Sequence, residues 1–163
     1  MNKLIDILYY LISKYPTKEE LSNYRTTKMV YLIDWHYSIK YQKQLTDIKW
    51  VFDNYGPFVW DIKDTVVKNK DIFNIVHTTN YYGSEKTLFS IKNTQFTIKL
   101  SDNEKSAIDY IIEHTKNLGN DSFTKLVYST YPMIVTEQYH KLDLVARAKE
   151  YQELKQKRKK NQE

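Results

Sequence analysis

The 163-residue chain contains no cysteine and only three glycines and three prolines. The absence of cysteine excludes disulfide bonds, thiolate metal sites and cysteine nucleophiles, and it fits a reducing compartment such as the cytoplasm. Three glycines are too few for a loop that cradles phosphate groups, and no Gly-x-Ser-x-Gly elbow is present. The common signatures of nucleotide binding and of serine hydrolysis are therefore absent.

Long apolar runs are also missing. No stretch approaches the ~20 apolar residues of a membrane-spanning helix. Residues 1–6 place charges inside an apolar segment and lack a small-residue cleavage site, so no leader peptide is predicted. We predict a cytoplasmic protein that does not associate with membranes.

Patterns of catalytic or metal-binding residues are equally scarce. The pair Glu113-His114 lacks a second ligand at helical spacing, and the acidic pair Glu19-Glu20 falls on a predicted surface turn. The four histidines are isolated from one another: His36, His77, His114 and His140. We therefore predict no enzymatic activity, no metal ion and no cofactor.

Charge is concentrated at the C-terminal end. Seven basic and three acidic side chains lie in residues 147–163, so this segment carries +4 of the net charge of +5. The nearly neutral remainder lacks the basic face of a typical nucleic-acid-binding domain. The polybasic end is suited to attract nucleic acid or an acidic protein groove. The alternative is a solubilising helix end in which lysines interact favourably with the helix dipole.

Tyrosine is the most conspicuous residue type, with fifteen copies. Its side chain offers a large contact area at a low entropic cost, which suits binding surfaces. The alternative is a coding bias, because AT-rich genomes encode much Tyr, Lys, Ile and Asn.

Helical periodicity marks the first quarter of the chain. Apolar residues recur at helical steps over residues 4–12, and Pro16 ends this helix. Residues 17–20 read Thr-Lys-Glu-Glu and predict a capping box at the start of a short second helix. Residues 26–41 are apolar on nearly all sides, which indicates a central buried helix.

The middle of the chain indicates β-structure. Alternation over residues 48–53 predicts an extended strand that ends in a turn at residues 54–57. Pro57 is expected in the first turn of a following helix. A hairpin is predicted from residues 87–91 and 95–100.

Helices return after this hairpin. Ser101 and Glu104 predict a second capping box, Leu118-Gly119 a helix end, and Asp121-Ser122 the cap of a short helix broken at Tyr131-Pro132. A final helix from about Leu142 is expected to dissolve in the Lys-rich end. The predicted fold class is α+β, a mostly helical single domain at residues 1–146 with a small antiparallel hairpin sheet between N- and C-terminal helices. Residues 147–163 form a basic helix end or tail.

The order of these signals resembles the Panacea, or SocA-like, domain family. A Lys-x-x-Tyr-Leu helix precedes an aromatic-Gly-Pro turn, a hairpin and a Leu-Ser-Asp-x-Glu-Lys helix start. The matching pieces are Thr27-Lys28-Met29-Val30-Tyr31-Leu32, Leu45-Thr46, Tyr55-Gly56-Pro57, Leu100-Ser101-Asp102-Asn103-Glu104-Lys105 and residues 123–132. They span about residues 2–132. Many members carry a His shortly before the late proline, where this chain has Ser129-Thr130-Tyr131-Pro132.

The resemblance implies an antitoxin. Members of this family are typically paired with a toxin gene and neutralise its product by direct protein contact, and some are phage-borne. The expected partner is therefore a cognate toxin protein, and the expected mechanism is occlusion of the toxin by an aromatic and aliphatic surface.

Seven residues are candidates for partner binding. We expect Tyr55-Gly56-Pro57 to shape a groove together with Trp60 and Tyr31, or alternatively to form only a structural turn. Lys28 sits on an otherwise apolar helix and is expected to meet an anionic partner group or to pair with Asp61 or Asp64. The full set is Lys28, Tyr31, Trp35, Tyr55, Gly56, Pro57 and Trp60.

Two alternative functions are carried forward. The first is a nucleic-acid-binding regulator or autorepressor that uses the basic tail, for which DNA binding is expected to fall steeply with salt. The second is a phage-encoded inhibitor of a host protein, which would use the same contact chemistry on a different target.

Overall fold

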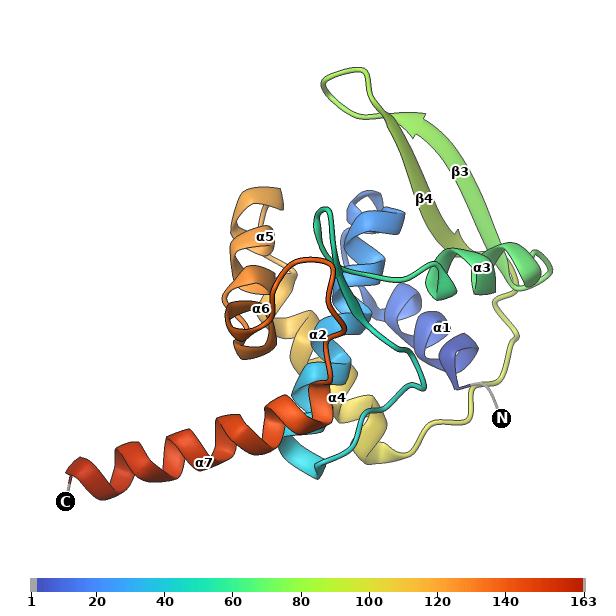
Figure 1. Ribbon diagram of the computed structural model, residues 1–163. Coiled ribbons are helices and arrows are strands. Elements are labelled where there is room, and N and C mark those ends of the chain that lie inside the picture. Colours follow the sequence, from blue (N-terminus) through green and yellow to red (C-terminus); the bar gives the residue numbers. More distant parts are fainter. Residues whose placement is uncertain (1–2, 163) are drawn as a thin grey trace. The chain divides into compact units, whose positions relative to one another are not determined.

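Helices and two short β-hairpins alternate along the chain, and a computed structural model describes residues 3–162 (Figure 1). The chain divides into two units. Unit 1 comprises Met1–Val30 and Trp60–Asn117, and unit 2 comprises Tyr31–Val59 and Leu118–Glu163. The division falls inside one long helix. Three residues lie outside the described part of the chain: Met1, Asn2 and Glu163. The first two belong to the N-terminal segment for which no leader peptide is predicted, and the last belongs to the predicted basic tail.

Unit 1 is built on two helices that pack against each other. Helix α1 buries its apolar face, and α4 lies beside it. The elements of this unit are α1 (Leu4–Lys14), the 3-10 helix η1 (Lys18–Glu20), the start of α2 (Asn23–Tyr41), α3 (Asp61–Lys68), β3 (Phe73–Thr79), β4 (Glu85–Ile91) and α4 (Asp102–Thr115).

The helix start at Ser101 is as predicted. The Ser101 Oγ accepts a hydrogen bond from the Glu104 backbone N–H (3.2 Å), and Glu104 Oε1 accepts one from the Ser101 backbone N–H (2.9 Å). Each side chain therefore satisfies a backbone donor that the first turn would leave unpaired. The corresponding prediction at Thr17 is wrong, because η1 has no side-chain cap and is only a 3-10 turn.

The β-hairpin of unit 1 has a different pairing from the predicted one. Strands β3 and β4 pair antiparallel from Phe73 opposite Ile91 to Thr79 opposite Glu85, whereas residues 95–100 form no strand. Tyr9 of α1 contacts the rings of both Phe73 and Phe96. The apolar alternation of the segment around Phe96 thus serves packing on α1 and not strand pairing. In Figure 1 the loop end of the hairpin points away from α1 and α3.

Unit 2 contains the remainder of α2 and the C-terminal helices. Its other elements are β1 (Val51–Asp53), β2 (Gly56–Phe58), α5 (Asn120–Tyr128), α6 (Tyr131–Val135) and α7 (Leu144–Gln162). Gly119 is the residue before α5 and does not end α4, whose C-cap is Lys116. Pro132 lies in the first turn of α6, where its missing N–H would be unpaired in any case.

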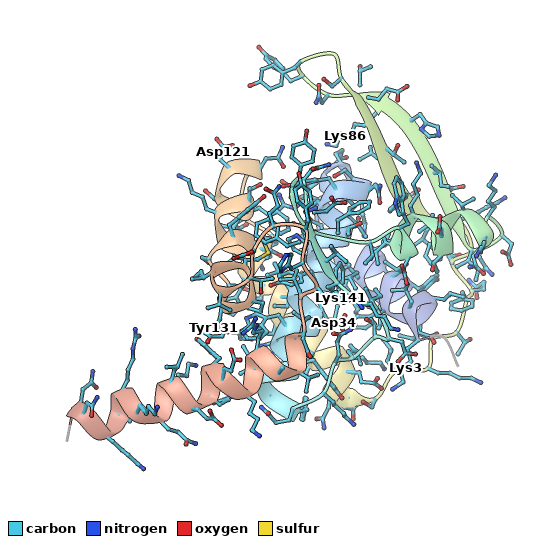
Figure 2. The ribbon with its side chains drawn as sticks, in the orientation of Figure 1. Lys3, Asp34, Lys86, Asp121, Tyr131 and Lys141 are labelled. Carbon is cyan, nitrogen blue, oxygen red and sulfur yellow. The ribbon has the colours of Figure 1, made fainter. Side chains whose placement is uncertain are left out.

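A buried carboxylate on α2 organises the chain that follows this helix. Asp34 Oδ1 accepts from the Thr46 backbone N–H (2.9 Å), and its Oδ2 accepts from the Thr46 hydroxyl (2.5 Å) and from Trp50 Nε1 (2.8 Å). Asp34 is completely buried. Figure 2 labels it on α2, within unit 2. Because a buried carboxylate needs donors, these bonds fix the path of residues 45–50 along α2.

The structure confirms the α+β, mostly helical fold class with small antiparallel strand pairs. The predicted boundary between residues 146 and 147 lies inside α7 and stays a prediction. Helix α7 is helical to Gln162, so it does not dissolve in the Lys-rich end. None of the described helices combines the length and apolar character that a membrane span requires.

The pH dependence of folding tests the Asp34 network. Burial raises the pKa of the Asp34 carboxyl to about 6 from an ordinary value of 3.8, although its hydrogen bonds from Thr46 and Trp50 oppose the shift. Between these two pKa values the folded state holds a proton that the unfolded state has released. The contribution of this group to the free energy of unfolding is therefore greatest at low pH. It falls by about 3 kcal/mol in total as pH rises from about 3 to about 7, and about 2 kcal/mol of this loss occurs between about pH 4 and 6.

The substitution Asp34→Asn provides the control. The side-chain amide of asparagine does not titrate, so the variant should lack this fall, and the wild-type-minus-variant difference in free energy of unfolding should decrease between pH 4 and 6. Urea unfolding at several pH values measures it. Parallel curves for the two proteins over that window would show that Asp34 has an ordinary pKa.

Candidate partner-binding site

The β1–β2 hairpin forms the centre of the candidate site. Asp53 pairs with Gly56 across the loop residues Asn54 and Tyr55. Gly56 has φ +97°, whereas the loop residues Asn54 and Tyr55 are not among the non-glycine residues with positive φ. This pattern is that of a type I turn followed by a bulge glycine. The turn points the Tyr55 side chain outward, where it is 74% exposed.

The Gly-Pro pair itself is buried and belongs to a strand. Pro57 lies opposite Phe52 in the β1–β2 pairing, so the prediction that it starts a helix is wrong. The next helix, α3, begins at Asp61. A proline is tolerated here because a short two-stranded ladder leaves one side of β2 without a strand neighbour that needs its N–H.

A later segment of the chain lines the other side of β1. The Phe52 N–H donates to the His140 carbonyl (3.0 Å), and the Tyr139 N–H donates to the Phe52 carbonyl (2.5 Å). The Tyr139 hydroxyl donates to Asn54 Oδ1 at the hairpin loop (2.7 Å). Tyr139 has φ +70°, an uncommon backbone conformation for a side chain of this size, and it is 64% exposed.

Tyr128, at the end of α5, completes the group. Its ring meets Phe52 edge-on with centroids 6.0 Å apart, and it would lie 3.4 Å from a Cβ placed on Gly56. Tyr128 is 38% exposed. We call Tyr55, Tyr128 and Tyr139 the tyrosine cluster. It brings the hairpin loop near a helix end and a loop that come much later in the sequence, all within unit 2.

The exposed groups of this arrangement suit contact with another molecule. They are aromatic rings and phenol hydroxyls, which bury large areas and form directional hydrogen bonds. Within residues 3–162 no group of three or more His, Asp or Glu side chains is placed to hold a metal ion.

The structure places the seven predicted residues in both units. Tyr55, Gly56 and Pro57 form the β1–β2 hairpin of unit 2, and their role in partner binding stays a prediction. Tyr31 and Trp35 are interior residues of the same unit. The Tyr31 hydroxyl shares a hydrogen bond with the Thr130 hydroxyl (2.8 Å), and Tyr31 packs edge-on against the Trp50 ring.

The Trp35 ring lies 5.7 Å from that of Tyr151 on α7. Lys28 and Trp60 belong to unit 1. Lys28 is buried with its Nζ 4.4 Å from the centroid of the Tyr24 ring, and Trp60 is largely exposed. Lys28, Tyr31 and Trp35 are buried in this structure, and their role in partner binding stays a prediction.

Tyr128 and Tyr139 were not among the sequence candidates. Neither has a distinctive local signal: Tyr128 follows the apolar residues Leu126 and Val127, and Tyr139 lies among polar residues. Their places beside Phe52 and Asn54 depend on tertiary structure alone.

A second exposed aromatic pair lies in unit 1. Tyr81 and Tyr82, in the loop between β3 and β4, are 96% and 88% exposed, with rings perpendicular at 5.5 Å. The Asn80 side chain accepts hydrogen bonds from the Tyr82 and Ser84 backbone N–H groups, both at 2.9 Å. This pair provides a matched comparison for the tyrosine cluster.

The fold is a small α+β protein, and its unit 2 presents exposed aromatic side chains. The family model described as antitoxin SocA-like, Panacea domain matches residues 27–132, more than half of the chain. The chain belongs to this family. Tyr55 and Tyr128 lie inside the matched region, and Tyr139 lies beyond it. No curated protein and no solved structure matches the chain.

The conformation of Gly56 predicts a specific stability change. Gly56→Ala should lower the free energy of unfolding by about 1–2 kcal/mol, because an L side chain is strained at φ +97°. The space beside Tyr128 is in itself sufficient for a methyl group. Urea denaturation measures the change.

Gly119→Ala is the matched control. Gly119 has φ −69° and no neighbour within 4 Å of an added Cβ, so its loss should be smaller, below about 1 kcal/mol. Equal losses at the two positions would contradict the role assigned to the backbone of Gly56.

Proposed function

We propose that this chain is an antitoxin that neutralises a cognate toxin by direct protein contact, without catalysis, through the tyrosine cluster of unit 2. The observation that carries the proposal is the exposure of Tyr55 and Tyr139 on a backbone fixed by hydrogen bonds. Membership of an antitoxin family supports a toxin as the partner.

The geometry favours a pre-organised contact. Tyr139 is held by its backbone bond to Phe52 and its hydroxyl bond to Asn54, so two segments are already joined before a partner arrives. A surface that is ordered in the free protein loses less conformational entropy on binding. Tyrosines have few rotatable bonds, and they are enriched among the residues that dominate binding energy.

The proposed mechanism is occlusion. The rings of the cluster would bury against an apolar surface of the toxin, and their hydroxyl groups would pair with polar groups at its rim. A protein interface of ordinary size covers about 1,600 Å² in total, which is larger than the cluster. The cluster would therefore supply the central anchors, and surrounding residues of unit 2 the rim.

The double variant Tyr55→Ala/Tyr139→Ala tests this proposal. We expect the affinity for the product of the neighbouring gene, measured by calorimetry with the purified proteins, to fall at least 30-fold, since exposed aromatic anchors commonly contribute more than about 2 kcal/mol. Rescue of growth on co-expression of the two genes should be lost in parallel. Both side chains are exposed, so the circular dichroism spectrum should be unchanged.

Tyr81→Ala/Tyr82→Ala is the matched control, because it removes from unit 1 two tyrosines that are even more exposed than Tyr55 and Tyr139. It should bind the toxin within about threefold of wild type. If Tyr81→Ala/Tyr82→Ala abolished binding and Tyr55→Ala/Tyr139→Ala retained it, the toxin-binding site would lie in unit 1 and the proposal would be contradicted. A wild-type chain that neither binds the neighbouring product nor rescues growth would refute the antitoxin function itself.

A further inference from the structure

The second half of α7 extends beyond its packing contacts. The first half is anchored by the burial of Leu144 and Ala148, and by the Gln152 side chain, whose Nε2 donates to the Ile39 carbonyl (3.0 Å). From residue 153 to residue 162 every residue is exposed. Figure 1 shows this part of α7 running out from α5 and α6, and Figure 2 shows its side chains spreading to all sides.

This projecting segment is strongly basic on its whole circumference. It holds a single acidic residue, Glu153, and a single large apolar residue, Leu154. Five basic side chains occupy six consecutive positions: Lys155, Lys157, Arg158, Lys159 and Lys160. Because each residue turns the helix by about 100°, these five positions point in all directions and no face is free of charge.

The segment is not explained by the stability of the helix alone. A helix that is polar on all sides gains nothing from packing. Lys155 and Lys159 are like charges four residues apart, a spacing that destabilises a helix, although the helix dipole partly offsets this repulsion. A polyanion would relieve the repulsion and stabilise the segment at the same time.

We infer that residues 153–162 of α7 are a binding element for duplex DNA, with the helix lying in the major groove. This groove is about 12 Å wide, admits an α-helix, and has phosphates on both of its walls. A helix that is charged all round can pair with both rows of phosphates at once. The inference stands independently of the toxin-binding proposal.

Other anionic partners fit the segment less well. Docking of a helix in a protein groove uses apolar anchors repeated at helical spacing, and Leu154 has no such companion within the segment. Single-stranded nucleic acid is bound by stacking of bases on aromatic rings, and no aromatic residue follows Tyr151. The major groove of duplex RNA is too deep and narrow for a helix.

The charge count gives a quantitative expectation. If all five basic side chains meet phosphates, the logarithm of the association constant should fall with the logarithm of salt concentration with a slope of about −4.5. Between 50 and 200 mM salt the affinity should then fall about 500-fold. Since phosphate contacts carry little sequence information, DNA of any sequence should bind similarly.

The test uses the full chain and a fluorescent 24-base-pair DNA duplex of arbitrary sequence, with binding followed by anisotropy at four salt concentrations. The variant is Lys157→Gln/Arg158→Gln/Lys159→Gln/Lys160→Gln. Lys155 is retained because its Nζ lies 4.6 Å from the Tyr151 ring centroid. All four substituted side chains are exposed, so the fold should be unaffected. We expect at least a tenfold weaker complex at 50 mM salt and a slope smaller by about 3.6.

The matched control makes the same change in net charge elsewhere. Lys68, Lys70, Lys92 and Lys99 are exposed residues of unit 1, and their replacement by Gln should leave the slope unchanged and the affinity within about threefold. Equal losses in the two variants would show a nonspecific effect of net charge and overturn the assignment. So would a wild-type slope shallower than −2, or equal competition by polyglutamate at the same charge concentration, which would indicate an acidic protein partner instead.

Discussion

One buried carboxylate determines how unit 2 presents its surface. Asp34 accepts hydrogen bonds from both the backbone and the hydroxyl of Thr46 and from the indole of Trp50. A buried carboxylate without hydrogen-bond donors is costly. Any other course of residues 45–50 would take these donors away from Asp34, and it is disfavoured for that reason. The segment after α2 is thereby held to one course. The Trp50 carbonyl then accepts from the Leu142 N–H (2.9 Å), which places the later segment of the chain beside β1.

The tyrosine cluster follows from that constraint. With Trp50 fixed, β1 has its register against both β2 and the segment that contains Tyr139. Gly56 and Tyr139 both have positive φ. Gly56 follows the loop of the β1–β2 hairpin, and Tyr139 holds a backbone conformation that is uncommon for a non-glycine residue although it is exposed. Strained non-glycine residues concentrate at functional sites because the surrounding structure must enforce them. Because this backbone is already ordered, unit 2 would lose less conformational entropy when it binds a partner.

The sequence predicted what depends on local periodicity and failed where distant segments decide. The helices at residues 4–12 and 26–41 and the cap at Ser101 follow from spacing and capping chemistry, and the structure contains them. Pro57 satisfies the rules for a helix start as well as those for an edge strand, and only its pairing with Phe52 decides. Tyr55 became a candidate through its glycine neighbour, and its role in binding stays a prediction. The positions of Tyr128 and Tyr139 near the β1–β2 hairpin could not be predicted, since they depend on tertiary structure.

Hydrogen exchange of backbone amides, in the free chain and in its complex with the product of the neighbouring gene, tests the central claim most directly. The account predicts new protection on binding in residues 52–58 and 137–141 of unit 2. Protection that is confined to unit 1, with exchange around Tyr55 and Tyr139 unchanged in a complex that forms, would contradict it.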